Sequence, residues 1–184
     1  MAYIDRHGFY DKAIQRPSAH CEQRPDVPIS LIIIHNISLP PFAYGTDAIH
    51  RLFQGALHNE SDPFLQSLSS LRVASHFMID RKGVVHQYVS CLNKAYHAGI
   101  SSFAGRDGCN DFSVGIELEG CDFEPYSEEQ YTALPPLLRA LMKAYPISAI
   151  SGHQDVSPDR KTDPGHFFAW DLLRKHNFPV VHND

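Results

Sequence analysis

The chain has 184 residues, of which 43% are apolar, so it is long enough to bury one sizeable core and short for two. We therefore expect residues 1–184 to form a single domain. The formal net charge of −5 and the lack of any Lys/Arg-rich run exclude the electrostatic pattern of a nucleic-acid-binding or membrane-surface protein.

The compartment is predicted from the N-terminal segment and the cysteines. The first residues, MAYIDRHGFYDKAIQRPSAH, place charges in every short window and lack the apolar core of a signal peptide. No later stretch has the length and apolar character of a transmembrane helix. The four cysteines form no CxxC pair, which disfavours a thiolate zinc site and a dense disulfide framework. We expect a cytoplasmic protein with free thiols and without a membrane partner.

The first predicted elements are a buried strand and an amphipathic helix. A β-branched apolar run covers residues 29–35 and ends at His35, which is typical of a strand buried on both faces. Residues 36–45 contain two prolines and a glycine and are predicted to form a loop. From Thr46, the expected N-cap, apolar residues recur at helical spacing as far as Leu57.

The middle of the chain predicts a hairpin and a further strand. Residues 75–89 contain two β-rich runs separated by RKG, which predicts two antiparallel strands. In SVGIELEG, apolar residues alternate with Gly115, Glu117 and Glu119. Side chains alternate between the two faces of a strand, so this strand has one apolar face and one face that carries both carboxylates. Glu117 and Glu119 therefore point the same way.

A longer helix is predicted after residue 127. Ser127 and Gln130 have the spacing of a capping box, and apolar residues then continue at helical spacing to Tyr145. Pro135 and Pro136 lie inside this pattern. A proline in a helix lacks the N–H donor and its ring collides with the preceding turn. We therefore expect the helix to kink or restart there.

The last predicted elements suggest the fold class. Residues 147–152 form another buried apolar run, and His153 follows its end just as His35 ends the first run. A short final helix is predicted at residues 170–175. Strands and helices alternate, with at least one hairpin among them, which predicts an α/β fold with a central mixed sheet flanked by helices. The two histidines could then meet at one edge of that sheet.

The segment GHQDVSPDRKTDPG, residues 152–165, concentrates one histidine, three aspartates and two cations in a loop broken by prolines and glycines. A zinc site for hydrolysis needs about three nitrogen or oxygen ligands and one open position. His35, His153 and Asp163 would supply two imidazoles and a carboxylate. Twelve histidines allow many such triples, so by spacing alone these residues could equally be exposed loop residues.

A cation next to the candidate ligands has a possible catalytic use. If the KTD segment is extended, Lys161 and Asp163 project to one side and Arg160 projects to the other. An ammonium group beside a metal could stabilise a developing oxyanion. A solvated side chain is the usual state of a single lysine and remains the alternative for Lys161.

Five segments of this chain resemble, in order, the motifs of a known enzyme family. They are LIIIHNISLPP, SHFMIDRKGVVHQYV, KAYHAG, CNDFSVGIELEG and GHQDVSPDRKTDPG. The family is that of the cytoplasmic AmpD-type 1,6-anhydro-N-acetylmuramyl-L-alanine amidases, within the zinc N-acetylmuramoyl-L-alanine amidase superfamily. The resemblance runs from Arg16 to Trp170. It implies the central mixed sheet and flanking helices shared with peptidoglycan recognition proteins and phage amidases.

The resemblance also implies roles for individual residues. One Zn²⁺ ion per chain would be held by His35, His153 and Asp163. Glu117 matches the catalytic acid/base, and Lys161 matches the lysine that stabilises the transition state. The implied positions along the substrate groove are Asn36, Arg72, Ala95, His97 and Arg106. The residues alone do not decide between Glu117 and its neighbour Glu119 as acid/base.

The implied reaction is hydrolysis of the amide between 1,6-anhydro-N-acetylmuramic acid and L-alanine in recycled muropeptides, which are small soluble substrates. By removing these muropeptides the family also restrains β-lactamase induction in some bacteria. Two alternatives are an envelope or phage-type amidase that acts on intact peptidoglycan, and a muropeptide-binding module without turnover. The predicted lack of an export signal disfavours the first, and the presence of every catalytic residue type disfavours the second. The oligomeric state is left open, and we expect a monomer.

Overall fold

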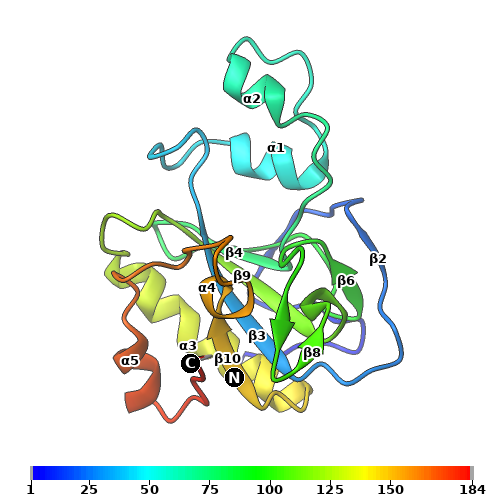
Figure 1. Cartoon of the computed structure of the whole chain (residues 1–184), viewed down its shortest axis with the longest axis vertical. Helices are drawn as coiled ribbons and strands as arrows, with labels where there is room; N and C mark the ends of the chain where they lie inside the picture. The colour runs from blue at the N-terminus through cyan, green and yellow to red at the C-terminus, as the bar shows by residue number, and fades with distance from the viewer. Residues whose placement is uncertain (1, 183–184) are drawn as a thin grey trace.

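The computed structural model of the chain describes residues 2–182, and a mixed sheet of six strands forms its centre (Figure 1). In spatial order the strands are β1 (Ile14–Gln15), β5 (Val85–Gln87), β4 (Phe77–Ile79), β9 (Ser113–Glu119), β3 (Leu31–Ile37) and β10 (Ala149–Gly152). Only β4 and β5 pair in the antiparallel sense, and the other neighbours in this sheet are parallel. The predicted α/β fold with a central mixed sheet is therefore confirmed.

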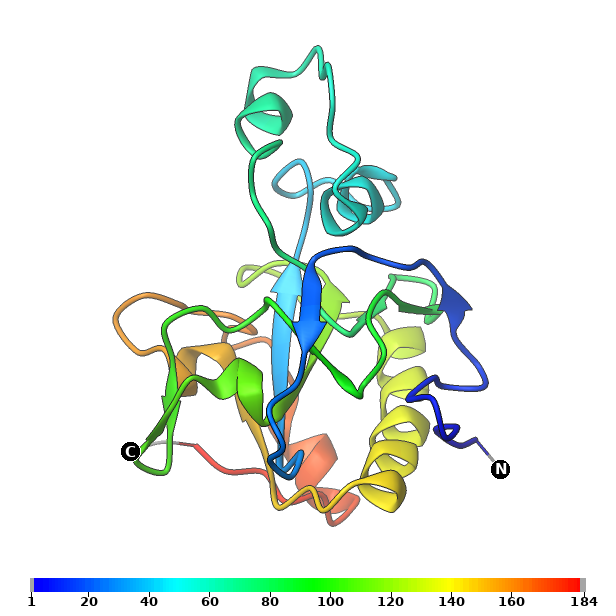
Figure 2. The same cartoon turned by 90° about the vertical axis from the view of Figure 1, so that its right-hand side faces the viewer.

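Helices and two small ribbons surround this sheet in the described part of the chain. The helices are α1 (Ala48–Gln54), α2 (Pro63–Ser67), α3 (Glu128–Ala144), α4 (His153–Val156) and α5 (Trp170–Lys175), with a 3-10 turn at Cys109–Asp111. The ribbons pair β2 (Cys21–Gln23) with β6 (Asn93–Ala95), and β7 (Ser102–Phe103) with β8 (Arg106–Asp107). Figure 2 shows the segment of α1 and α2 projecting beyond the end of the sheet.

The two faces of the sheet are covered differently. On one face, Ile32, Ile34 and the apolar residues of β9 pack with α3 and α5 into the largest apolar cluster. On the other face, Met78 packs with α1 in one cluster, while Leu31 and Ile33 pack with residues near β7 and α4 in another. His35 follows Leu31 and Ile33 at alternate positions of β3, so it lies on this second face.

Helix α1 is shorter than the sequence predicts. Its N-cap is Asp47, whereas the Thr46 hydroxyl donates a hydrogen bond to the Leu39 carbonyl group. Gly55 ends the helix with a φ of 70°, a left-handed conformation that costs glycine little. The helical spacing of apolar residues continues to Leu57, but the helix itself stops at this glycine.

Helix α3 begins with the predicted capping box but does not restart at the prolines. It continues from Glu128 to Ala144 with Pro135 and Pro136 inside it. Leu134 and Leu138, on either side of the prolines, are fully buried against the sheet. Burial of this apolar face offsets the backbone hydrogen bonds that the prolines lack.

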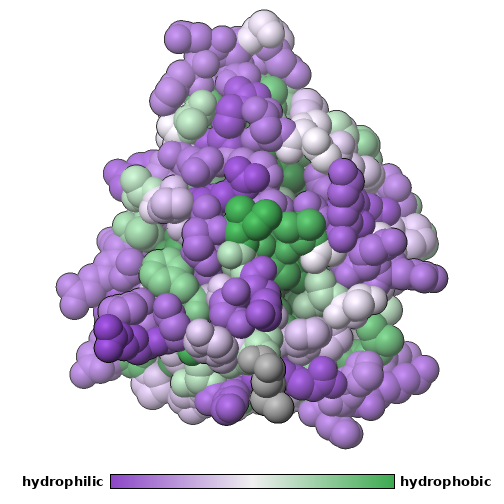
Figure 3. Space-filling view, turned by 180° about the vertical axis from the view of Figure 1, so that it is seen from behind, coloured by the Kyte–Doolittle hydropathy of each residue, from purple (hydrophilic) through white to green (hydrophobic). Residues whose placement is uncertain are grey.

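None of the helices in residues 2–182 combines the length and the apolar character needed to cross a bilayer. The face opposite to the view of Figure 1 is mostly hydrophilic, with one apolar patch near its centre (Figure 3).

Candidate active site

Two histidines and an aspartate converge at one end of the central sheet. Gly152 pairs with Ile34, so His153, the next residue, lies level with His35 on the neighbouring strand. The His35 Nδ1 atom is 3.0 Å from His153 Nδ1 and 3.1 Å from Asp163 Oδ2. The distance from His153 Nδ1 to the same carboxylate oxygen is 3.0 Å. The structure thus brings together the three residues that the sequence offered as metal ligands.

The hydrogen bonds around this cluster suit a metal ion. The His153 Nε2–H group donates to the Ala98 carbonyl group at 3.2 Å, which leaves a lone pair on His153 Nδ1. His35 Nε2 lies 2.9 Å from His97 Nδ1, and with the ring proton of His35 on Nε2 in this contact, His35 Nδ1 is likewise free to bind. Burial and the nearby His153 together lower the pKa of His35 to about 4, although Asp163 acts in the opposite direction, so the imidazole is neutral at pH 7. Two neutral imidazoles and a carboxylate are ligands that Zn²⁺ accepts.

His97 is fixed in place by its own contacts. Its ring lies over Gly115, where an added Cβ atom would come within 2.6 Å of two ring atoms. The Ser113 hydroxyl is 3.3 Å from His97 Nε2, and Asn110 Oδ1 accepts the backbone N–H groups of His97 and Ala98. A ring held in this way orients the imidazole that it contacts. The family resemblance implied that His97 lines the substrate groove, but no sequence pattern indicated its contact with His35.

Glu117 and Glu119 share a face of β9, as predicted, but this face is buried and their surroundings differ. Glu119 accepts the backbone N–H of Gly45 at 2.6 Å and that of Arg81 at 3.1 Å. Glu117 pairs with His35 on the adjacent strand, about 4.8 Å away in the usual spacing of a sheet. Its buried Oε2 atom has no hydrogen-bond partner among residues 2–182.

The protonation of Glu117 is set by this environment. Burial raises the pKa of its carboxyl group well above the usual range, Asp163 raises it further, and Lys161 opposes both. A buried carboxyl group with a raised pKa and no fixed partner is suited to taking up and releasing a proton. Both carboxylate oxygens of Glu119 accept hydrogen bonds from backbone N–H groups. Glu119 therefore has a structural role.

A cationic cavity of about 540 Å³ opens beside the cluster. His97 and His153 line it together with Arg72, Arg160 and Lys161. An extended KTD segment would direct Arg160 away from Lys161, yet Arg160 and Lys161 both line this cavity. Three cations on one side of the cluster would attract an anionic ligand.

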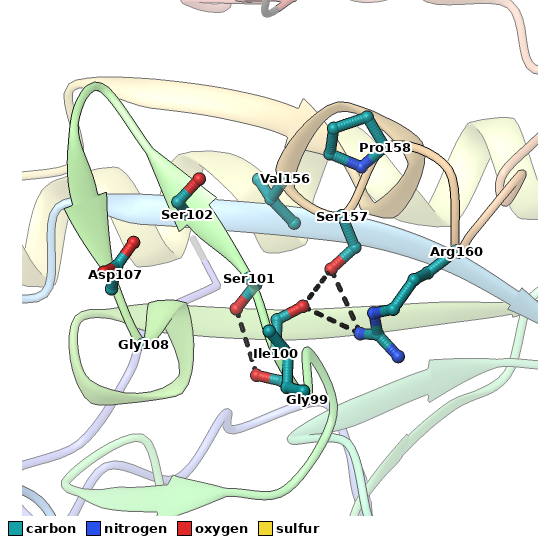
Figure 4. Close-up of a pocket in the computed structure, with 10 residues that line it drawn as sticks. All are labelled: Gly99, Ile100, Ser101, Ser102, Asp107, Gly108, Val156, Ser157, Pro158 and Arg160. Carbon is teal, nitrogen blue, oxygen red and sulfur yellow. Dashed lines mark hydrogen bonds between the residues drawn. The ribbon is translucent and has the colours of Figure 1, made fainter.

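The side chain of Arg160 is held by a hydrogen bond to the loop that contains Ile100. It donates to the Ile100 carbonyl group at 2.7 Å, and the Ser157 hydroxyl donates to the same oxygen at 2.6 Å. Figure 4 shows both side chains pointing toward Ile100. Ile100, Ser157 and Arg160 belong to the lining of an adjoining cavity of about 400 Å³. The two cavities share Gly99, Ile100 and Arg160 in their walls.

Three of the predicted groove residues lie outside the cationic cavity. Asn36 donates to Asp122 Oδ1 at 2.7 Å and to the Pro164 carbonyl group at 3.3 Å. Arg106 places its guanidinium group 4.0 Å from the centre of the Phe112 ring. Ala95 is fully buried in the apolar cluster that includes the residues of α1. Its side chain is therefore not accessible to a substrate.

An α/β protein with a His-His-carboxylate cluster beside a buried, unpaired glutamate has the arrangement of a metal-assisted hydrolase. Comparison with known proteins identifies the family of hydrolases to which the chain is related. The family model of the N-acetylmuramoyl-L-alanine amidases matches residues 25–166. The chain belongs to the N-acetylmuramoyl-L-alanine amidase family, whose members are amide hydrolases.

Individual relatives agree with this assignment. The chain is 46% identical over 161 residues to the 1,6-anhydro-N-acetylmuramyl-L-alanine amidase AmpD of Escherichia coli K12, covering 86% of this chain and 88% of that protein. A crystal structure of a selenomethionine AmpD derivative superimposes with a TM-score of 0.89 at 42% identity, over 95% of this chain and 98% of that one. The human peptidoglycan recognition protein PGRP-IBETAC shares the fold, with a TM-score of 0.63 at 16% identity, over 94% of this chain and 99% of that one.

Proposed function

We propose that the chain, as a single domain of residues 1–184, is a zinc-dependent 1,6-anhydro-N-acetylmuramyl-L-alanine amidase of cell-wall recycling. The substrate class follows the E. coli relative, which covers nearly the same length. The observation that carries the proposal is the convergence of His35, His153 and Asp163 beside the unpaired carboxyl group of Glu117. One zinc ion per chain fits this donor set better than Ca²⁺ or Mg²⁺, which prefer oxygen ligands.

The amide that joins the lactyl group of the sugar to L-alanine is unreactive toward free water. A zinc ion held by the cluster would polarise the scissile carbonyl group and make water a stronger nucleophile at neutral pH. Glu117 takes a proton from the attacking water and passes it to the nitrogen of the leaving alanine. Its raised pKa allows it to hold that proton between the two steps. His97 keeps the His35 ring aligned throughout.

Lys161 contributes a positive charge to the same region. Its side chain is exposed, and its charge lowers the pKa of both Glu117 and His35, which places it within electrostatic reach of the cluster. An ammonium group there stabilises the negative charge that develops on the carbonyl oxygen in the transition state. The role of Lys161 is therefore electrostatic and belongs to the chemical step.

The peptide portion of the substrate carries carboxylates, and we place it in the cationic cavity. Arg72 and Arg160 line this cavity, and a guanidinium group binds a carboxylate through two parallel hydrogen bonds. Arg106 lies near the adjoining cavity, where Asp107 is part of the wall. The ligand is thus a soluble muropeptide, and we propose a monomeric, cytoplasmic enzyme that uses no nucleic acid or membrane.

A comparison of two substrates tests this function. Purified enzyme is incubated with 1,6-anhydro-N-acetylmuramoyl peptides and, separately, with intact sacculi, and released peptides are quantified by mass spectrometry. We expect rapid release from the soluble fragments and little from the sacculi. Comparable rates on both would overturn the recycling assignment in favour of an envelope or phage-type amidase.

The metal is tested by elemental analysis. The wild-type protein is expected to contain about one zinc per chain, and His153→Ala is expected to lose most of it, because one of three protein ligands is removed. Full zinc retention by this variant would exclude His153 from the ligand set.

A further inference from the structure

Two phenylalanines stand together on the surface outside the cationic cavity. Phe42 is 60% exposed and Phe123 is 72% exposed. Their ring centres are 6.2 Å apart, and the rings are tilted by 44°. Single exposed apolar residues are common on proteins, but two exposed aromatic rings in contact form a surface that neither packing nor solubility explains. We call Phe42 and Phe123 the aromatic pair.

The loops that carry the aromatic pair are firmly held. The loop before α1 is tied to β9 by the bond from the Gly45 N–H to Glu119, and to the loop after β9 by the bond from the Tyr44 hydroxyl to Glu124 at 2.9 Å. Phe42 itself has a φ of 65°, a region that favours glycine. The chain thus keeps an exposed aromatic side chain in an unfavourable backbone conformation, and such outliers often mark functional positions.

The aromatic pair lies close to the metal cluster. Asp122, which precedes Phe123, accepts hydrogen bonds from Asn36 and from Thr162. Asn36 follows His35 in the sequence, and Thr162 precedes Asp163. The loop that presents Phe123 is therefore bonded to the neighbours of two cluster residues.

The cluster separates two chemically different surfaces. Figure 1 shows the loop before α1 and the loop after β9 on one side of the end of β3, and β8 on the other. The cationic cavity, lined by Gly99 and Ile100 just before β7, lies toward the second side. One side therefore carries Arg72, Arg160 and Lys161, whereas the other carries the aromatic pair.

We propose that the aromatic pair is a subsite for the sugar of the substrate. This inference rests on the proposed function, because the amide that is hydrolysed there joins an uncharged sugar to a peptide that carries carboxylates. With the amide at the cluster and the peptide in the cationic cavity, the sugar extends over Phe42 and Phe123. The C–H groups on one face of a pyranose ring carry small positive charges, and the face of an aromatic ring is negative. The pair provides binding energy to the sugar half of the substrate alone.

Inhibition by each of the two reaction products distinguishes a sugar subsite from a general structural role of the aromatic pair. The double variant Phe42→Ala/Phe123→Ala is compared with wild type by measuring inhibition by 1,6-anhydro-N-acetylmuramic acid and, separately, by the free stem peptide. We expect the inhibition constant for the sugar to rise roughly tenfold and that for the peptide to stay unchanged, with KM raised and kcat nearly constant. The double variant Phe42→Tyr/Phe123→Tyr keeps the rings and is expected to restore sugar binding.

A matched control uses another exposed phenylalanine. Phe64 on α2 is 44% exposed and lies on a different surface segment, so Phe64→Ala is expected to leave both inhibition constants unchanged. If the wild type cleaves muropeptides but the Ala double variant binds the sugar product as tightly as wild type does, the subsite is wrong. Equal weakening of both products would also overturn it, because that result indicates a distorted site. Failure of the wild type to cleave any muropeptide would count against the proposed function itself.

Discussion

Glu117 and Glu119 lie two residues apart on one face of β9, and their neighbours assign them different roles. Glu117→Gln keeps the volume and a hydrogen-bonding end but removes the proton acceptor. We expect zinc content and substrate binding to persist while kcat falls by roughly 10² to 10⁴. Steady-state kinetics and metal analysis of the purified variant check this prediction.

Glu119→Gln is the matched control for that variant. The Gly45 and Arg81 N–H groups bond to different oxygens of Glu119, and the amide keeps an acceptor for only one of them. We therefore expect a loss of stability but a kcat within about threefold of wild type. An inactive Glu119→Gln variant together with an active Glu117→Gln variant would show that Glu119, not Glu117, is the acid/base.

We propose that Lys161 contributes to the chemical step by stabilising the transition state. Lys161→Gln is expected to lower kcat by roughly 10² to 10³ with little change in KM or zinc content, because the lost charge stabilises only the transition state. The matched variant Arg160→Gln should mainly raise KM. An unchanged kcat with a raised KM in Lys161→Gln would make this lysine a substrate-binding cation instead.

His97 is expected to support the metal through His35. His97→Ala removes the group that fixes the His35 ring, and loss of such a partner typically weakens metal binding about 10- to 100-fold. Gly115→Ala should produce a similar change, because the added methyl group displaces the His97 ring. Competition with a chromophoric chelator measures the affinity. Wild-type affinity in both variants would show that His97 has no positioning role.

Some site residues could be predicted from the sequence and others could not. His35 and His153 were predictable because each ends a buried apolar run, and parallel strands bring such ends together. The choice of Glu117 over Glu119 could not be made from alternation alone, since it depends on the Gly45 and Arg81 N–H groups from other segments. The buried position of Ala95 depends on the packing of α1, which short-range patterns do not specify.

The proline pair in α3 lowers the stability of that helix. Pro136 is exposed within the helix, so Pro136→Ala restores an N–H donor without opening the core. We expect the free energy of unfolding to rise by about 1–2 kcal/mol, after allowing for the greater freedom of the unfolded chain. Urea unfolding measures the change. Pro17→Ala, in a loop, serves as the control, and a destabilised Pro136→Ala would contradict this view of the helix.

The longer elements were predictable because each has a strong period or cap. The strand at β9, the hairpin of β4 and β5, the capping box of α3 and the final helix α5 were all predicted and are confirmed. The strands β1, β7 and β8 span two residues each, too few for any hydrophobic period to form. β1 is positioned by its pairing with the distant β5, whereas β7 and β8 pair with each other across the turn at Ala104 and Gly105.

A bound metal ion is expected to stabilise the fold of the whole molecule. His35, His153 and Asp163 come from distant parts of the chain, so a metal that binds all three favours the native state. Removal of zinc by a chelator should abolish activity and lower Tm by about 10 °C, and added zinc should restore both. Magnesium should restore neither. An active, equally stable chelated protein would exclude a metal role.

Isotope labelling identifies the amide that this site hydrolyses. The enzyme is incubated with a 1,6-anhydro-N-acetylmuramoyl peptide in water enriched in oxygen-18, and both products are weighed by mass spectrometry. Attack of water on the lactyl carbonyl group predicts one heavy oxygen in the sugar product and none in the peptide, which is released with a free N-terminal alanine. Label in the peptide, or an uncleaved substrate in the presence of zinc, would exclude hydrolysis of this amide by water attack at the lactyl carbonyl group.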